Sequence, residues 1–289
     1  MPGRNLPGTG RRAARVAVGQ STTHDLEFGD EVVIKRYRSW DRREPQREWT
    51  ALTLLAEHAP GLAPAPIRAD LNVSPPTVVM SRLPGHVLRG APATVAQIDA
   101  VAAAFTRLHQ AIPGPVLEAV EPAAWGPAAA VAKVRTWADK RPDLGHDADV
   151  RHAFQEGATW LATNAPDRLI SDPLPPVLGL SDGNHANYLW DDGDRQVRLL
   201  DWEDSGRSDR AFEIAEFCEH TSRLDGTFDT EHLLAAVNVT EKEHRRIHDF
   251  RRLLALGWLL MLGPAGPFTA RSPAGTLERQ AQRVLHLLA

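Results

Sequence analysis

Three polar residues in one segment have the types and spacing that phosphoryl transfer uses. Asp182 is followed five residues later by Asn187, and Asp201 ends the second of two short apolar runs that form a predicted hairpin. The reaction needs a carboxylate to position or deprotonate the attacking hydroxyl, and oxygen ligands that hold Mg²⁺ against the nucleotide phosphates. Turn formation and helix capping explain the same residue types, so the segment alone favours neither interpretation.

Two charged residues nearer the N-terminus strengthen the first interpretation. Lys35 lies in the apolar strand pattern VVIKRY, where a charged side chain is unfavourable unless it is paired. Glu48 follows in a helical pattern, and a strand lysine held by a helix glutamate is the phosphate-binding half of such a site. A surface salt bridge, or a lysine that faces water, explains either residue alone. The order of all these parts along the chain argues against chance.

The elements that must position these residues divide the chain into two parts. Apolar alternation predicts strands between 15 and 37 and between 75 and 85, with a helix over 42–58 between them. After Thr94 the pattern is mostly helical, interrupted by the hairpin within 180–204. We therefore predict an α+β fold with three sections: a disordered tail (1–14), a β-rich nucleotide-binding lobe (15–84) and a helical lobe for catalysis and substrate binding (85–289).

Composition limits the classes of function. The chain has 289 residues and a formal net charge of −4, so it lacks the basic excess of a nucleic-acid binder. Cys218 is the single cysteine, which excludes an internal disulfide and a cysteine-based zinc site. The longest apolar stretch, Leu253 to Leu262, is shorter than the roughly 20 residues of a membrane span. We expect a cytoplasmic protein with no membrane partner, as a monomer or homodimer.

The ordered set of motifs resembles the aminoglycoside phosphotransferase family, small-molecule kinases with the two-lobed protein-kinase-like fold. That family has His-Gly-Asp followed by Asn five positions after the Asp, where this chain has Leu180-Ser181-Asp182 and Asn187. The resemblance implies Asp182 as catalytic base, Asn187 and Asp201 as Mg²⁺ ligands, and Lys35 as the ATP phosphate-binding residue.

By the same resemblance, Glu48 is the partner of Lys35. The chief departure from the family pattern is Leu180, which replaces a histidine that usually supports the loop.

The nucleotide site follows from the same resemblance. The glycine-rich loop is represented by VGQSTTHDLEF, in which Ser21 and Thr22 are expected to contact phosphate. In VVMSRLPG the family places the hinge, so Met80 would lie behind the adenine and the backbones of Ser81 and Leu83 would bind its edge. Core packing explains Met80 equally well.

The acceptor is predicted to be a small molecule with a hydroxyl group, and an aminoglycoside or related amino sugar is the leading candidate. Choline-like alcohols, other antibiotics and other metabolites stay open. Glu203 and Asp209 are expected to face a cationic acceptor, whereas His185 and the acidic residues 204, 213, 216 and 219 are expected to face solvent. Other classes are a nucleotide-binding pseudokinase and a protein kinase; Trp-Glu after Asp201, instead of Phe-Gly, disfavours the latter.

Overall fold

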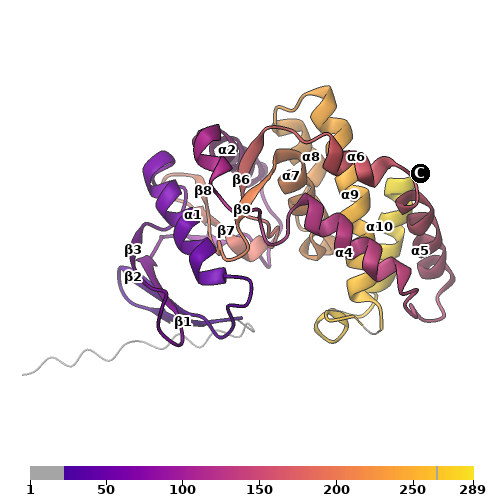
Figure 1. Ribbon diagram of the computed structural model, residues 1–289, viewed down its shortest axis with the longest axis horizontal. Helices are drawn as coiled ribbons and strands as arrows, with labels where there is room; N and C mark the ends of the chain where they lie inside the picture. The colour runs from indigo at the N-terminus through magenta and orange to yellow at the C-terminus, as the bar shows by residue number, and fades with distance from the viewer. Residues whose placement is uncertain (1–22, 265) are drawn as a thin grey trace, which may run out of the picture.

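A small antiparallel sheet and a larger group of helices lie at opposite ends of the molecule (Figure 1). The structure is a computed structural model that describes residues 23–264 and 266–289. The predicted strand in RVAVGQS and the residues Ser21 and Thr22 lie outside these described residues. The α+β division into a β-rich lobe and a helical lobe is as predicted.

From residue 23 onward, where the structure describes the chain, the small lobe holds a four-stranded antiparallel sheet with strand order β1-β2-β4-β3. The strands are β1 (Asp25–Phe28), β2 (Val32–Arg36), β3 (Pro66–Asp70) and β4 (Thr77–Ser81), and the sequence pattern predicted all of them except β3. Helix α1 (Glu44–His58) packs against β3 and β4 and directs Leu52, Leu55 and Glu48 inward. Register places Lys35 in the sheet between Leu26 of β1 and Val78 of β4.

Two further small sheets belong to the larger lobe. The predicted hairpin is confirmed as β7 (Tyr188–Asp191) and β8 (Gln196–Leu199), and β5 (His86–Val87) pairs with β7. The second sheet joins β6 (Pro176–Gly179) to β9 (Gly206–Asp209). Strand β8 stops at Leu199, so the expectation that Asp201 ends the strand is wrong. Asp201 instead lies two residues beyond it with φ 63°, a left-handed conformation that turns the chain.

Side chains cap the N-termini of several helices in the large lobe. Thr94 and Thr240 form capping boxes with Gln97 and Glu243, which satisfy amide groups at the starts of α2 and α9. The helices after α1 are α2 (Val95–Ala111), α3 (Gly114–Glu118), α4 (Pro127–Asp139), α5 (Ala148–Leu161), α6 (Ala165–Ser171), α7 (Arg210–Glu219), α8 (Thr230–Ala236), α9 (Glu241–Leu262) and α10 (Thr276–Leu288).

The described part of the chain also contains three short 3₁₀ segments: His185–Asn187, Thr221–Asp225 and Thr269–Arg271. Among the described residues no helix has the length and apolar character needed to cross a membrane.

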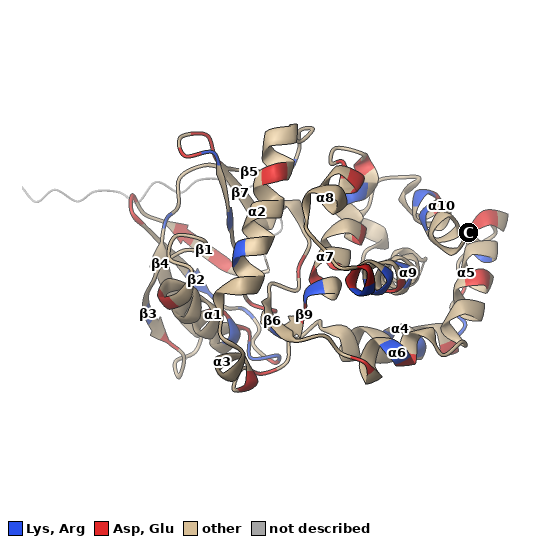
Figure 2. Ribbon diagram, turned by 90° about the horizontal axis from the view of Figure 1, so that it is seen from above, with Lys and Arg blue, Asp and Glu red and all other residues tan. Residues whose placement is uncertain are grey.

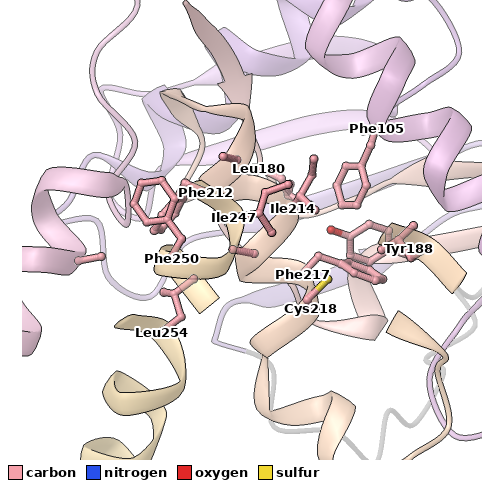
Figure 3. Close-up of a cluster of buried hydrophobic side chains, with 14 of the residues drawn as sticks. Phe105, Leu180, Tyr188, Phe212, Ile214, Phe217, Cys218, Ile247, Phe250 and Leu254 are labelled. Atoms are coloured by element: carbon pink, nitrogen blue, oxygen red, sulfur yellow. The ribbon is translucent and has the colours of Figure 1, made fainter. Parts of the chain in front are cut away.

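Helix α7 lies at the centre of the large lobe, between the hairpin and α9 (Figure 1). Its Phe217 packs edge to face against Phe105 of α2 and Tyr188 of β7, with ring centroids 5.4 and 4.7 Å apart (Figure 3). The α7 residues are almost all buried, whereas charged residues of both signs mark one end of α9 (Figure 2). The apolar core therefore fixes α7 directly behind the segment that carries Asp182.

Candidate active site

The ammonium group of Lys35 brings together three carboxylates from distant parts of the chain. Its Nζ atom lies 2.7 Å from Glu48 Oε2, 2.5 Å from Asp201 Oδ1 and 2.7 Å from Glu203 Oε2. Lys35 and Glu48 are only 4% and 1% exposed, so both charges have left water and depend on each other. The predicted pair of strand lysine and helix glutamate is present, and Asp201 meets it as the motif order implied.

Burial and charge act in opposite directions on these groups. Burial raises the pKa of Asp201 to about 7, and Glu203 and Glu48 add to that rise against the effect of Lys35. Burial opposes ionisation of Lys35, but Asp201 and Glu48 outweigh it and raise the Lys35 pKa well above its usual value. Burial also opposes ionisation of Glu203, yet the hydrogen bond from His24 and the charge of Lys35 lower its pKa to about 2.

Two residues that the sequence did not single out hold this cluster in place. The His24 Nδ1 atom accepts from the Arg38 amide at 3.2 Å, so the imidazole proton is on Nε2, 2.8 Å from Glu203 Oε2. The Tyr37 hydroxyl donates to Glu48 Oε2. Neither residue is recognisable from a single sequence, because both act through the pairing of distant side chains.

The loop with Asp182 lies beside Asp201. The Leu200 amide donates to the Asn187 carbonyl at 2.9 Å, which places Asn187 next to the residue that precedes Asp201. Asn187 is buried, and its Nδ2 atom has no hydrogen-bond partner among the described residues. Glu48, Asp201 and Glu203 offer carboxylate oxygens that lie within 4.8 Å of one another. A hard divalent cation prefers such oxygen ligands, and the side chain of Asn187 is free to add one.

The Asp182 carboxylate has one engaged oxygen and one open oxygen. Its Oδ1 atom accepts from the Asn184 amide at 3.0 Å and lies 3.7 Å from His220 Nε2. The described residues provide no hydrogen bond to Oδ2, and the side chain is 33% exposed. An oxygen held on one side and open on the other is suited to accept a proton from an incoming hydroxyl.

The residue before Asp182 has a strained backbone that a buried glutamate holds. Ser181 has φ 62°, a left-handed conformation that is uncommon for a residue other than glycine. Its amide donates to Glu213 Oε2 at 2.9 Å, while Glu213 Oε1 accepts from the hydroxyls of Ser181 and Ser208 at 3.2 and 2.5 Å. Glu213 is therefore a support of the catalytic loop, not the solvated helix carboxylate that the sequence suggested.

The expected hinge lies at the edge of the small sheet. Met80 is buried in β4. The Ser81 amide donates to the Ala65 carbonyl at 2.9 Å, and the Ala65 amide donates to the Ser81 hydroxyl at 2.8 Å. The Ser81 amide and hydroxyl are therefore engaged within the protein, and the Ser81 amide is not open to a ligand.

The prediction that Asp209 contacts the acceptor is wrong, because both of its carboxylate oxygens have partners inside the protein. Asp209 Oδ1 caps α7 by accepting from the Ala211 amide at 2.8 Å, and Oδ2 accepts from Arg246 Nε at 2.6 Å. Arg246 also donates to the carbonyls of Leu169 and Asp172. Asp209 thus joins α7 to α9 and α6.

The structure also differs from the expectations for three other acidic residues and for His185. Glu203 belongs to the Lys35 cluster and is 8% exposed, so it does not line an open rim. Glu216 and Glu219 are buried rather than solvated: Glu216 accepts from Trp125 Nε1 at 3.2 Å, and Glu219 pairs with Arg251 and Arg283. His185, expected at the surface, is 1% exposed beside Phe217 and Phe228.

Comparison with solved structures defines the class of this fold. The chain aligns with a choline/ethanolamine kinase family protein from Mesorhizobium loti at TM-score 0.63 and 18% identity, covering 93% of this chain and 90% of that one. A choline kinase from Streptococcus pneumoniae gives TM-score 0.60 and 14% identity, with 94% and 91% covered.

An aminoglycoside phosphotransferase crystallised with AMP-PNP and hygromycin B gives TM-score 0.58 and 13% identity, with 94% and 91% covered. The fold is therefore that of the protein-kinase-like small-molecule kinases.

The sequence itself identifies the family. Residues 10–250 match the family described as "Phosphotransferase enzyme family", the aminoglycoside phosphotransferase (APH) group. No curated protein matches the sequence significantly. The chain belongs to this family and is a phosphotransferase that acts on hydroxyl groups of small molecules.

Replacing Lys35 tests the charge balance of the cluster. We expect Lys35→Met to lower the free energy of unfolding by about 3 kcal/mol at pH 7, because it leaves the buried carboxylates of Glu48 and Glu203, and the partly exposed one of Asp201, without their cation. Urea unfolding measures the change. The control is Arg36→Met on the same strand, whose half-exposed pair with Glu27 predicts a loss below about 1 kcal/mol. Equal losses in the two variants would contradict the argument.

Replacing Asp209 tests its structural role. Asp209→Asn leaves the buried Arg246 guanidinium unpaired, so we expect a loss of about 3 kcal/mol in unfolding free energy and unchanged affinity for nucleotide and acceptor. Asp167→Asn, at an exposed pair with Arg135, is the control and should cost under about 1 kcal/mol. A stable variant with a raised KM for the acceptor would restore the acceptor-binding hypothesis.

Proposed function

We propose that the chain transfers the γ-phosphoryl group of ATP, with Mg²⁺, to a hydroxyl group of a small amine-bearing molecule, with an aminoglycoside or related amino sugar as the leading acceptor. The observation that carries this proposal is the open Oδ2 atom of Asp182 beside the Lys35, Asp201 and Asn187 group. Structures of the same fold with AMP-PNP, ADP, hygromycin B and spectinomycin support the class of both substrates.

In the proposed reaction, Asp182 Oδ2 orients the acceptor hydroxyl and takes its proton as the oxygen attacks the γ-phosphorus. The bond from the γ-phosphorus to the β,γ-bridging oxygen breaks at the same time, and ADP is the leaving group. Asn187 and Asp201 would hold Mg²⁺, which supplies charge neutralisation at the phosphate oxygens when bound. Lys35 donates to the phosphates and releases Asp201 from their mutual ion pair. The Ser81 carbonyl and the Leu83 amide bind the edge of the base. Positioning and electrostatic stabilisation provide most of the acceleration.

A choline-like alcohol is the second candidate acceptor, and the choline kinase structures of the same fold favour it. Trp258 packs edge to face on His220, 5.0 Å between centroids, and His220 borders Asp182. Trp125 donates to Glu216. Burial and the charge of Asp182 raise the pKa of Glu216 to about 8. A protonated Glu216 would not add negative charge at pH 7, which suits an acceptor with a single cation. The two candidates thus differ in the number of cations that the site must accept.

An acceptor panel tests the proposal. Purified protein with γ-labelled ATP and Mg²⁺ would be incubated with aminoglycosides, amino sugars, choline, ethanolamine and a protein substrate. Label on an aminoglycoside or amino sugar supports the leading acceptor, and label on choline the second candidate. Tight ATP binding without transfer to any acceptor would instead indicate a nucleotide-binding regulator.

Asp182→Asn tests the assignment of the base. The amide keeps the size and the hydrogen bond near Asn184 but cannot take a proton, so we expect kcat to fall by at least about 10³-fold. Binding of an ATP analogue should change by less than about threefold, because Asp182 does not contact the Lys35 cluster. Retention of near wild-type kcat would show that another group accepts the proton.

A further inference from the structure

Gly183 makes the loop of Asp182 lie flat against the last turn of α7. A Cβ atom at position 183 would lie 2.5 Å from the Glu216 carbonyl oxygen and 2.8 Å from Phe217 Cα, so only glycine fits. Leu180, two residues before Asp182, is buried and apolar, and its side chain gives the loop packing but no hydrogen bond (Figure 3). The loop therefore needs polar support from another element.

The guanidinium group of Arg223 provides that support from the 3₁₀ segment Thr221–Asp225. Its Nη2 atom donates to the Gly183 carbonyl at 2.7 Å, and Nη1 donates to Ser222 Oγ at 2.9 Å. The group lies over the Phe217 ring, 3.7 Å from its centroid, and 5.2 Å from that of Phe228. Planar stacking with a directed hydrogen bond is a geometry that Arg can adopt and Lys cannot.

Arg223 is unusual because it is buried without an ion pair. It is 8% exposed, and among the described residues no carboxylate oxygen lies within ion-pair distance of it. Burial lowers the Arg223 pKa, while the charges of Asp225 and Asp182 oppose that change, so the field of Asp182 reaches this cation. A buried cation is costly, and the aromatic faces and the Gly183 carbonyl offset only part of that cost.

His220, three residues earlier, contacts the same loop from its other side. The Ser222 amide donates to His220 Nδ1 at 3.1 Å, so the neutral imidazole carries its proton on Nε2, which points to Asp182 Oδ1 at 3.7 Å. Burial lowers the His220 pKa and keeps this tautomer uncharged at pH 7. His220 and Arg223 thus contact both the side chain of Asp182 and the Gly183–Asn184 peptide.

We propose that Arg223 is a positioning residue for phosphoryl transfer, whose guanidinium fixes the Gly183 carbonyl and so aims the Asp182 carboxylate at the acceptor. It touches neither substrate and acts only through the loop. The inference rests on the proposed role of Asp182 as the base. Small displacements of a catalytic group lower the rate by large factors. The hydrogen bond from Arg223 to the Gly183 carbonyl therefore affects kcat more than it affects nucleotide binding.

The test combines hydrogen exchange with kinetics on the full chain. Arg223→Met keeps length and packing but removes both hydrogen bonds. We expect amide exchange in residues 181–187 to rise at least about tenfold, kcat to fall about 10- to 100-fold, and KM for ATP to stay within about threefold. Arg223→Lys should fall between Met and wild type in both measurements, and it provides a folded variant if Met at this position lowers the yield.

Arg252→Met is the matched control, because Arg252 also donates to a carbonyl of another segment, Leu287, but far from the loop. It should leave loop exchange and kcat unchanged. Arg223→Met with wild-type loop exchange and kcat, or with exchange raised equally throughout the protein, would overturn the proposal. The exchange measurement needs no acceptor. A wild-type chain that transferred no phosphate would therefore contradict the proposed function, while hydrogen exchange would still test whether Arg223 holds the loop in place.

Discussion

The burial of one ammonium group among three carboxylates is the interaction on which the nucleotide side of this protein depends. Lys35 comes from β2, Glu48 from α1, and Asp201 and Glu203 from the chain after β8. Lys35, Glu48 and Glu203 depend on this pairing, because each would otherwise be a buried charge without a partner. The cluster therefore links the two lobes at the point where the phosphates are proposed to bind.

The acceptor side depends on α7 in the same way. Glu213 holds the strained Ser181, the backbone at Glu216 and Phe217 requires Gly183, and the aromatic core fixes the helix behind them. Asp209 begins the helix and anchors it to α9 through Arg246. Asp182 thus gains a defined position from residues that do not touch the substrate, as preorganised catalysis requires.

The sequence predicted what depends on local pattern and residue type. Strands β1, β2 and β4, helix α1 and the β7–β8 hairpin follow from periodicity and turn residues, and Lys35, Glu48 and Asp201 follow from their order. Outside these motif residues, the sequence did not predict which side chains pair across long distances. His24, Tyr37 and Arg223 look like ordinary polar residues until the fold brings Glu203, Glu48 and Gly183 to them.

The errors of prediction have one physical cause. Asp209, Glu216 and Glu219 were expected to face solvent or an acceptor because acidic residues on helices usually do. Here α7 is buried on all sides, so each carboxylate had to find a donor: Arg246 for Asp209, Trp125 for Glu216, and Arg251 with Arg283 for Glu219. Charge density in a helix is thus a poor guide to exposure when that helix lies at the centre of the lobe.

Charge balance also explains why the ligand set ends with an amide. Three carboxylates around Lys35 exceed its single positive charge. Burial raises the pKa of Asp201 to about 7, and the charges of Glu203 and Glu48 add to that rise against the effect of Lys35. A divalent cation would compensate the cluster, whereas another carboxylate would deepen its imbalance. As a proposed ligand, Asn187 would contribute an oxygen without charge and so would complete the set at no further electrostatic cost. Asp182, the proposed base, lies outside the cluster, so its open oxygen is free for the acceptor.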